Sequence, residues 1–109
     1  MQIWLNDCLV DAAAAGVALD GWPDGEGIFE TIKTENGEIF ELGRHMRRAI
    51  DAAVQKKIKL PDEELIRTAI SQLMLAESHA VGRLRLLFSR DRFVAVHQFY
   101  EDITKPAKL

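Results

Sequence analysis

A two-residue turn, Asn36-Gly37, lies in this 109-residue chain between two segments that read as strands. Residues 28–34 before it are rich in β-branched side chains and alternate in polarity, the pattern of a strand with one buried face. Asn and Gly both tolerate the positive φ of a tight hairpin turn, so residues 38–42 are expected to return as the partner strand. The sequence therefore predicts a β-hairpin, on which the following segments must pack.

Two helices are predicted after this hairpin. Beginning at Gly43, apolar residues recur every three or four positions, which defines one face of a helix. That buried face is predicted to contain Met46, Ala49, Ile50, Ala53 and Val54. Pro61 breaks the chain, and Asp62 stands where it can cap a second helix. The buried face of the second helix is predicted to contain Leu65, Ile66, Ala69, Ile70, Leu73 and Met74.

The first part of the chain predicts a second, smaller hairpin. Two short apolar runs, residues 3–5 and 8–10, flank the polar pair Asn6-Asp7. The alanine-rich residues 11–18 fit either a helical turn or a loop, and Gly16 weakens the helix. Residues 21–25 are dense in chain breakers and predict a loop.

The last part of the chain returns to a strand pattern. Residues 81–89 alternate, with Leu84, Leu86 and Phe88 on one side, and residues 93–99 form a final strand after a turn at Asp91-Arg92. The predicted order is ββββααββ, in which strands are grouped rather than interleaved with helices. This order favours an α+β fold in which an antiparallel sheet packs against two helices.

Length and composition predict one domain over residues 1–100, followed by a linker-like tail over residues 101–109 that contains Pro106. The net charge of −3, without a long basic run, disfavours nucleic acid or an anionic membrane as the main partner. Cys8 is alone, so no disulfide forms within the chain, and a reducing cytoplasm fits best. No secretory signal or membrane span is expected.

Two arginine motifs are candidates for binding anions. His45 and Arg48 are three residues apart on the first predicted helix and therefore share a face. A guanidinium is always charged, and its fork of donors suits phosphate oxygens. Arg83 and Arg85 are two residues apart on a strand, so both point to one face of the sheet. Like charges on one sheet face require solvent, carboxylates or an anionic ligand nearby. The alternative for Arg48 is that it lies on a solvated helix face and binds no ligand. The alternative for Arg83 and Arg85 is that they are ordinary arginines of an edge strand.

Other polar residues give weaker signals. Gly25-Glu26-Gly27 precedes a strand, whereas a phosphate-binding loop precedes a helix, so these glycines are interpreted as a tight entry into the strand. Glu30 is a carboxylate among apolar neighbours. Such a residue can be a tuned acid or base, but more often it is paired or lies at a sheet edge, so Glu30 is not assigned to catalysis. His79 and His97 are isolated in the sequence, and no residues have the spacing of metal ligands, so no metal site is predicted.

The segment Gly25-Glu26-Gly27-Ile28-Phe29-Glu30-Thr31 and the motif His45-x-x-Arg48, taken together, resemble the N-terminal small domain of class IV (fold-type IV) pyridoxal-phosphate enzymes. This family includes branched-chain and D-amino-acid aminotransferases and aminodeoxychorismate lyases. The resemblance implies that Arg48 binds the phosphate of pyridoxal phosphate and that Arg85 binds the carboxylate of an amino-acid-like substrate. It implies that His45 is structural, and that the partners are a large pyridoxal-phosphate domain or a second copy of the chain.

No lysine of this chain matches the family lysine that holds the cofactor covalently. The lysines are Lys33, Lys56, Lys57, Lys59, Lys105 and Lys108. A lysine that reacts with a carbonyl must be held in a pocket that lowers its pKa, and the family lysine lies in the large domain. No residue of the chain is therefore assigned to catalysis, and the chain alone is predicted to be inactive. The alternative is a stand-alone, non-catalytic α+β interaction or assembly module derived from the same family.

Overall fold

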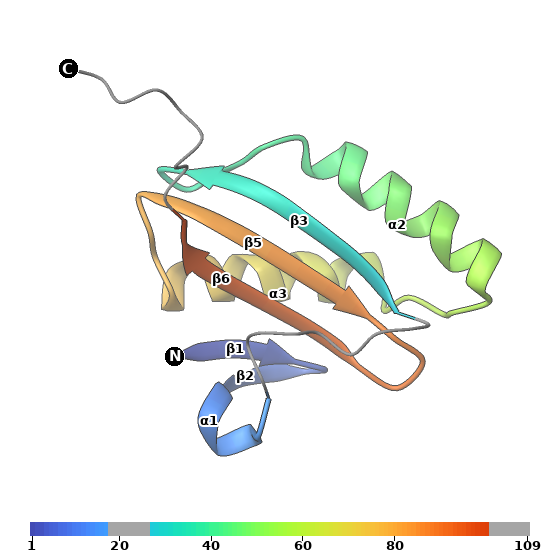
Figure 1. Ribbon diagram of the computed structural model, residues 1–109, viewed down its shortest axis with the longest axis horizontal. Helices are drawn as coiled ribbons and strands as arrows, with labels where there is room; N and C mark the ends of the chain where they lie inside the picture. The colour runs from blue at the N-terminus through green and yellow to red at the C-terminus, as the bar shows by residue number, and fades with distance from the viewer. Residues whose placement is uncertain (18–26, 101–109) are drawn as a thin grey trace.

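A computed structural model of the chain describes residues 1–17 and 27–100. It confirms the α+β fold: six antiparallel strands form one sheet in the order β2-β1-β6-β5-β3-β4, and α2 and α3 pack on one of its faces (Figure 1). The elements are β1 (Gln2–Leu5), β2 (Cys8–Asp11), α1 (Ala12–Ala15), β3 (Ile28–Glu35), β4 (Glu38–Ile39), α2 (Leu42–Lys56), α3 (Glu63–Ala76), β5 (Val81–Phe88) and β6 (Phe93–Phe99). The loop predicted at residues 21–25 lies outside the described residues.

The small hairpin at the beginning of the chain is confirmed. Strands β1 and β2 pair in register around Asn6, whose φ of 58° turns the chain. The alanine-rich segment after it forms the short helix α1 rather than a loop. Asp11 caps this helix by accepting a hydrogen bond from the Ala14 amide, and Gly16 ends it with a φ of 70°. A left-handed backbone at that position is easiest for glycine, because glycine has no Cβ.

The central hairpin forms as predicted, but its second strand is shorter than expected. Asn36 and Gly37 have φ angles of 49° and 83°, and they place Glu35 opposite Glu38. The strand predicted for residues 38–42 ends at Ile39. Glu41 then adopts a left-handed backbone with a φ of 55°, and helix α2 begins at Leu42. Because the chain turns out of the sheet at Glu41, β4 pairs with only the last two residues of β3.

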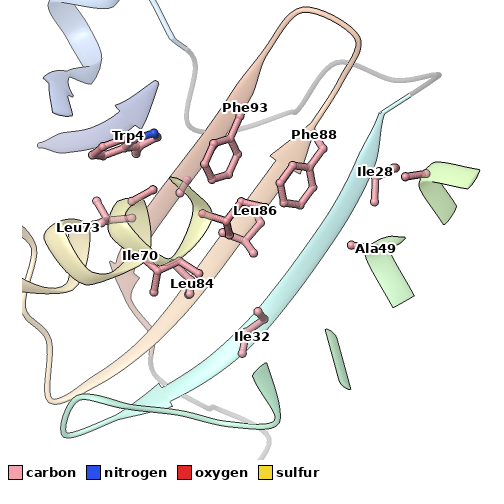
Figure 2. Close-up of a cluster of buried hydrophobic side chains, with 14 of the residues drawn as sticks. Trp4, Ile28, Ile32, Ala49, Ile70, Leu73, Leu84, Leu86, Phe88 and Phe93 are labelled. Atoms are coloured by element: carbon pink, nitrogen blue, oxygen red, sulfur yellow. The ribbon is translucent and has the colours of Figure 1, made fainter. Parts of the chain in front are cut away.

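The main hydrophobic core lies between the sheet and the helices α2 and α3 (Figure 2). Leu84, Leu86 and Phe88 of β5 point into it together, as their alternation predicted. The ring of Phe88 stacks on that of Phe93, with the centroids 5.0 Å apart. The other buried members are Trp4, Ile28, Ile32, Ala49, Ala53, Ile58, Ile66, Ala69, Ile70, Leu73 and Ala95. Burying each of the large side chains contributes roughly 1.5–3 kcal/mol.

The predicted buried face of α2 is wrong at two positions. Ile50 is 51% exposed and Val54 is 75% exposed, whereas Ala49 and Ala53 are buried. Helix α2 packs on β3 through these two small alanines, while α3 packs over β1, β2 and β6 (Figure 1). The two helices are therefore spread apart over the sheet. Ile50 faces the gap between them instead of a neighbouring helix, and Val54 follows it by one turn.

The opposite face of the sheet has a smaller cluster. Ile3, Ala12, Leu87, Val94 and Val96 pack together there, where α1 adjoins the sheet. Next to them, the parts of β3 and β5 that carry polar side chains lie on the same face. Among the described elements no helix covers this polar part of the sheet.

Candidate functional site

Arg48 lies on the exposed side of α2, one turn after His45. The start of α2 is fixed to the sheet by a contact between His45 Nδ1 and Glu30 Oε1, 2.7 Å apart. Glu30 is only 6% exposed and points from β3 towards the helix, so this carboxylate is paired, which is one of the alternatives expected from the sequence. Within the described residues, the Arg48 side chain makes no hydrogen bond or ion pair. Its donors are therefore available to an anion.

Arg85 is half-buried on the other face of the sheet. Its Nη2 donates to Gln98 Oε1 on β6, 2.8 Å away. Arg83 lies on the same face, as predicted, and its guanidinium carbon is 4.3 Å from the centroid of the Tyr100 ring. Lys33 stands opposite Arg83 in the register of β3 and β5. Three cationic side chains thus share this polar part of the sheet, and they favour anions there.

A shallow cavity of about 300 Å³ lies on this basic surface. It is lined by Thr31, Lys33, Glu35, Val81, Gly82, Arg83 and Tyr100. Arg85 is beside this cavity rather than in its wall. The cavity accepts only a small molecule, and its charged walls favour a polar one.

Arg48 and Arg85 do not meet in one pocket of this chain. Leu84 and Leu86 point to the face covered by α2, so Arg85, between them on β5, points to the opposite face. Arg48 belongs to the helix on the first face. Both faces adjoin β3, and β4 pairs with only Thr34 and Glu35, so most of the outer edge of β3 has no partner strand among the described elements.

The structure brings together two histidines that are far apart in the sequence. The ring centroids of His79 and His97 are 5.1 Å apart, so the fold brings these residues together although they are isolated in the sequence. His97 is fully buried: its Nε2 is 2.7 Å from Thr34 Oγ1, and its Nδ1 is 2.6 Å from the carbonyl oxygen of Glu77. Because a carbonyl only accepts, Nδ1–H donates to Glu77, and in the neutral imidazole Nε2 then accepts from the Thr34 hydroxyl.

This arrangement holds His97 as a neutral imidazole. Burial lowers the pKa of His97 below its ordinary value of 6.5, and the neighbouring His79 lowers it further. The hydrogen bond to the Glu77 carbonyl acts in the opposite direction but does not reverse the shift. The alternation of β3 places Thr34 inward, but β6 is buried at five successive positions, so no sequence pattern pointed to His97 as its partner.

The glycine-rich entry to β3 is described only at Gly27. A Cβ there would lie 3.0 Å from Leu87 Cδ1, so the neighbouring strand packs closely against this position. Lys56 Nζ donates to the Gly27 carbonyl at 3.1 Å and so links the end of α2 to the start of β3. Gly27 therefore allows the Leu87 side chain of β5 to pack closely against the backbone. Gly25 and Glu26 lie outside the described residues.

Comparison with known proteins identifies the family. Residues 27–102 match the family described as amino-transferase class IV, which is more than half of the chain. The chain therefore belongs to the class IV aminotransferase family. The match contains the hairpin, Glu30, the motif with His45 and Arg48, and the strand with Arg85.

Several curated relatives share this sequence pattern. The chain is 26% identical over 93 residues to a D-alanine aminotransferase of Listeria innocua, covering 83% of this chain and 32% of that protein. It is 25% identical over 107 residues to a D-alanine aminotransferase of Bacillus licheniformis, covering 95% of this chain and 38% of that protein. A chloroplastic D-amino-acid transaminase of Arabidopsis thaliana is 35% identical over 66 residues, covering 60% of this chain and 18% of that protein. The chain thus spans about a third of the length of the D-alanine aminotransferases.

In residues 1–17 and 27–100, no group of three or more His, Cys, Asp or Glu side chains is arranged to hold a metal ion. None of the described helices is both long and apolar enough to span a membrane.

Proposed function

We propose that this chain is the small domain of a pyridoxal-phosphate-dependent class IV aminotransferase or lyase. In this proposal Arg48 binds the phosphate of the cofactor, and Arg85 binds the carboxylate of an amino-acid-like substrate. Family membership over residues 27–102 supports the assignment. The observation that carries it is the Arg48 guanidinium, which has no hydrogen bond or ion pair within residues 1–17 and 27–100 and follows by one turn a histidine fixed to the buried Glu30.

The residues near Arg48 fit a phosphate group. A phosphate dianion requires several N–H donors, and an arginine without a protein partner offers five in a planar fork. Arg47 lies on the same helix and adds positive potential, whereas the charge of Arg44 is partly offset by Glu41, with Arg44 Nη1 3.7 Å from Glu41 Oε1. When bound, pyridoxal phosphate supplies an electron sink for charge that develops on an amino-acid substrate. The contribution of this chain is to bind and orient the phosphate.

The surroundings of Arg85 fit a carboxylate. Gln98 holds the guanidinium in place, and Arg83 and Lys33 stand nearby on the same face. The names of the D-alanine aminotransferases among the relatives favour a small amino acid as the substrate. Since Arg48 and Arg85 lie on opposite faces of the sheet, the cofactor and the substrate would meet across the outer edge of β3. A large pyridoxal-phosphate domain would complete the site and supply the lysine, and a dimer in the cytoplasm is the expected setting.

A phosphate-binding experiment tests the role of Arg48. Pyridoxine 5′-phosphate carries the ring and the phosphate but no aldehyde, so it does not react with lysines. In an NMR titration of the chain, it is expected to shift amide signals near the start of α2, whereas unphosphorylated pyridoxine is not. Arg48→Ala should abolish these shifts, while the matched control Arg44→Ala should retain them. If the two variants behave alike, Arg48 is not the phosphate ligand.

A second titration tests Arg85. Pyruvate carries a carboxylate and a small side chain, which are the two features expected of the substrate that binds at Arg85. Arg85→Ala should weaken the response to pyruvate more than the response to pyridoxine 5′-phosphate, because only the carboxylate contact is removed. An equal loss of both responses, or of neither, would contradict the assignment. A folded chain that responds to neither ligand would favour the stand-alone assembly module.

A further inference from the structure

The gap between α2 and α3 forms a groove that is separate from the arginine sites. Its volume is about 640 Å³, which is within the range of pockets that hold small organic ligands. It is lined by Leu42, Gly43, Met46, Arg47, Ile50, Leu60, Pro61, Glu63, Ile66, Arg67 and Ile70. Most of these side chains are apolar, and Ile66 and Ile70 at its base belong to the main core.

The wall of the groove on α2 is exposed, although its apolar residues follow the pattern of a buried helix face. Leu42, Met46, Ile50 and Val54 follow one another at four-residue intervals along α2, so they form one apolar stripe. The stripe becomes progressively more open: Met46 is half-buried, Ile50 is 51% exposed and Val54 is 75% exposed. A stripe that the domain itself does not cover is a candidate surface for an apolar ligand.

The charges at the rim select the type of ligand. Arg67 Nη2 donates to Glu63 Oε1 at 2.6 Å, so these two charges offset each other. Arg47 also lines the groove, and within the described residues it has no ion pair. The next residue on α2 is Arg48, Arg44 is paired with Glu41, and Asp51 is the only acidic residue of that helix. The uncompensated charge of the rim is therefore positive.

We propose that this groove binds an amphiphilic carboxylate, that is, an unbranched alkyl chain with a carboxylate head, as in a medium-chain fatty acid. The alkyl chain lies along Met46, Ile50, Ile66 and Ile70, where it replaces water on the apolar walls. The carboxylate lies at the rim, where it accepts hydrogen bonds from the Arg47 guanidinium and stays away from Glu63. Burial of the alkyl chain provides most of the affinity, and Arg47 selects the sign of the head group.

Gly43 offers a direct test of the groove. A Cβ built at this position meets no atom within 4 Å, so a side chain can begin here without a clash at its first carbon. Its φ is not positive, and replacing glycine within a helix favours the helix. Gly43→Phe is therefore expected to fill the groove while the domain stays folded, which circular dichroism and thermal unfolding can verify.

The experiment is a titration of the chain with decanoate below its micellar concentration. Binding is measured by isothermal titration calorimetry and by the shifts of NMR amide signals. Decanoate is expected to bind with a stoichiometry of one and to shift the signals of α2 and α3. Decyltrimethylammonium, which has the same alkyl chain and the opposite charge, is expected to bind at least several-fold more weakly. Gly43→Phe should abolish the binding of decanoate.

Two charge variants complete the test. Arg47→Glu should weaken decanoate roughly three-fold to ten-fold, because it reverses one exposed charge beside the head group. Arg44→Glu makes the same change on the same helix outside the groove and should have the smaller effect. The proposal is overturned if decanoate does not bind, if the cationic chain binds equally well, or if Gly43→Phe leaves binding intact. Self-association that Gly43→Phe abolishes, without decanoate binding, would instead identify a second copy of the chain as the occupant.

Discussion

Replacing Gly82 by alanine should destabilise this domain more than the addition of a single methyl group suggests. Gly82 is buried in β5 between β3 and β6, next to the hydrogen bond that joins Thr34 and His97. A Cβ at this position would lie 2.5 Å from His97 Nε2, 2.8 Å from Thr34 Oγ1 and 3.0 Å from the carbonyl oxygen of Gln98. The last of these is backbone, and the other two belong to fully buried side chains. None of the three can move away without breaking other contacts.

The magnitude follows from three effects. Forcing an extra methyl group into a packed interior costs about 1–3 kcal/mol. Separating Thr34 from His97 leaves buried polar atoms without partners, which costs about 1–3 kcal/mol more. The lower chain entropy of alanine in the unfolded state offsets up to about 1 kcal/mol. The free energy of unfolding should therefore fall by roughly 2–5 kcal/mol, and Tm by about 10 °C or more.

The assay is urea unfolding followed by circular dichroism, with Gly43→Ala as the matched control. Gly43 lies in helix α2, and an added Cβ there meets nothing within 4 Å. Its replacement should leave stability unchanged or raise it by up to about 1 kcal/mol. Gly82→Ala should thus lower the urea midpoint of unfolding, whereas Gly43→Ala should leave it unchanged or raise it. A loss below about 1 kcal/mol for Gly82→Ala, or equal effects of both variants, would refute the packing argument.

Three further predictions concern stability. The pKa of His97 is lower in the folded state than its ordinary value of 6.5, so the unfolded chain binds more protons below that pH. Urea unfolding at several pH values should show that the contribution of His97 to stability is complete above pH 6.5 and declines as the pH falls below it. A free energy of unfolding that does not change over this pH range would contradict the prediction. His45→Ala leaves the buried Glu30 carboxylate without its partner and should cost about 2–4 kcal/mol, whereas the double variant with Glu30→Gln should recover part of this loss in the same assay. Leu73→Ala in the core should cost about 2–5 kcal/mol, but Leu75→Ala on the same helix, at an 82% exposed position, should change stability by less than about 0.5 kcal/mol; similar thermal shifts for both would be inconsistent with the observed burial.

Local patterns predicted most of the elements correctly. The turn at Asn36-Gly37 needs only residues that accept positive φ, and that requirement is visible in the sequence. The inward direction of Leu84, Leu86 and Phe88 follows from strand alternation alone. The strand predicted for residues 38–42 was too long, because no local sequence pattern indicates that Glu41 adopts a left-handed backbone.

The candidate site was predicted in part. The sequence placed His45 and Arg48 on one helix, and the resemblance indicated their roles. It could not show that Glu30 reaches His45, because that contact depends on how α2 lies across β3. The pairing of His79 with His97 was missed for a similar reason, since the two side chains approach each other only after β5 and β6 have paired.

The sequence by itself determined the α+β class, the two hairpins, the two long helices and the membership in the class IV aminotransferase family. These properties depend on local periodicity, turn chemistry and short motifs, all of which are written along the chain. The tertiary structure alone decided that Arg48 and Arg85 lie on opposite faces of the sheet and that Ile50 lines an open groove. The periodicity of a helix shows which side is apolar, but only the distance between packed elements determines whether that side is covered.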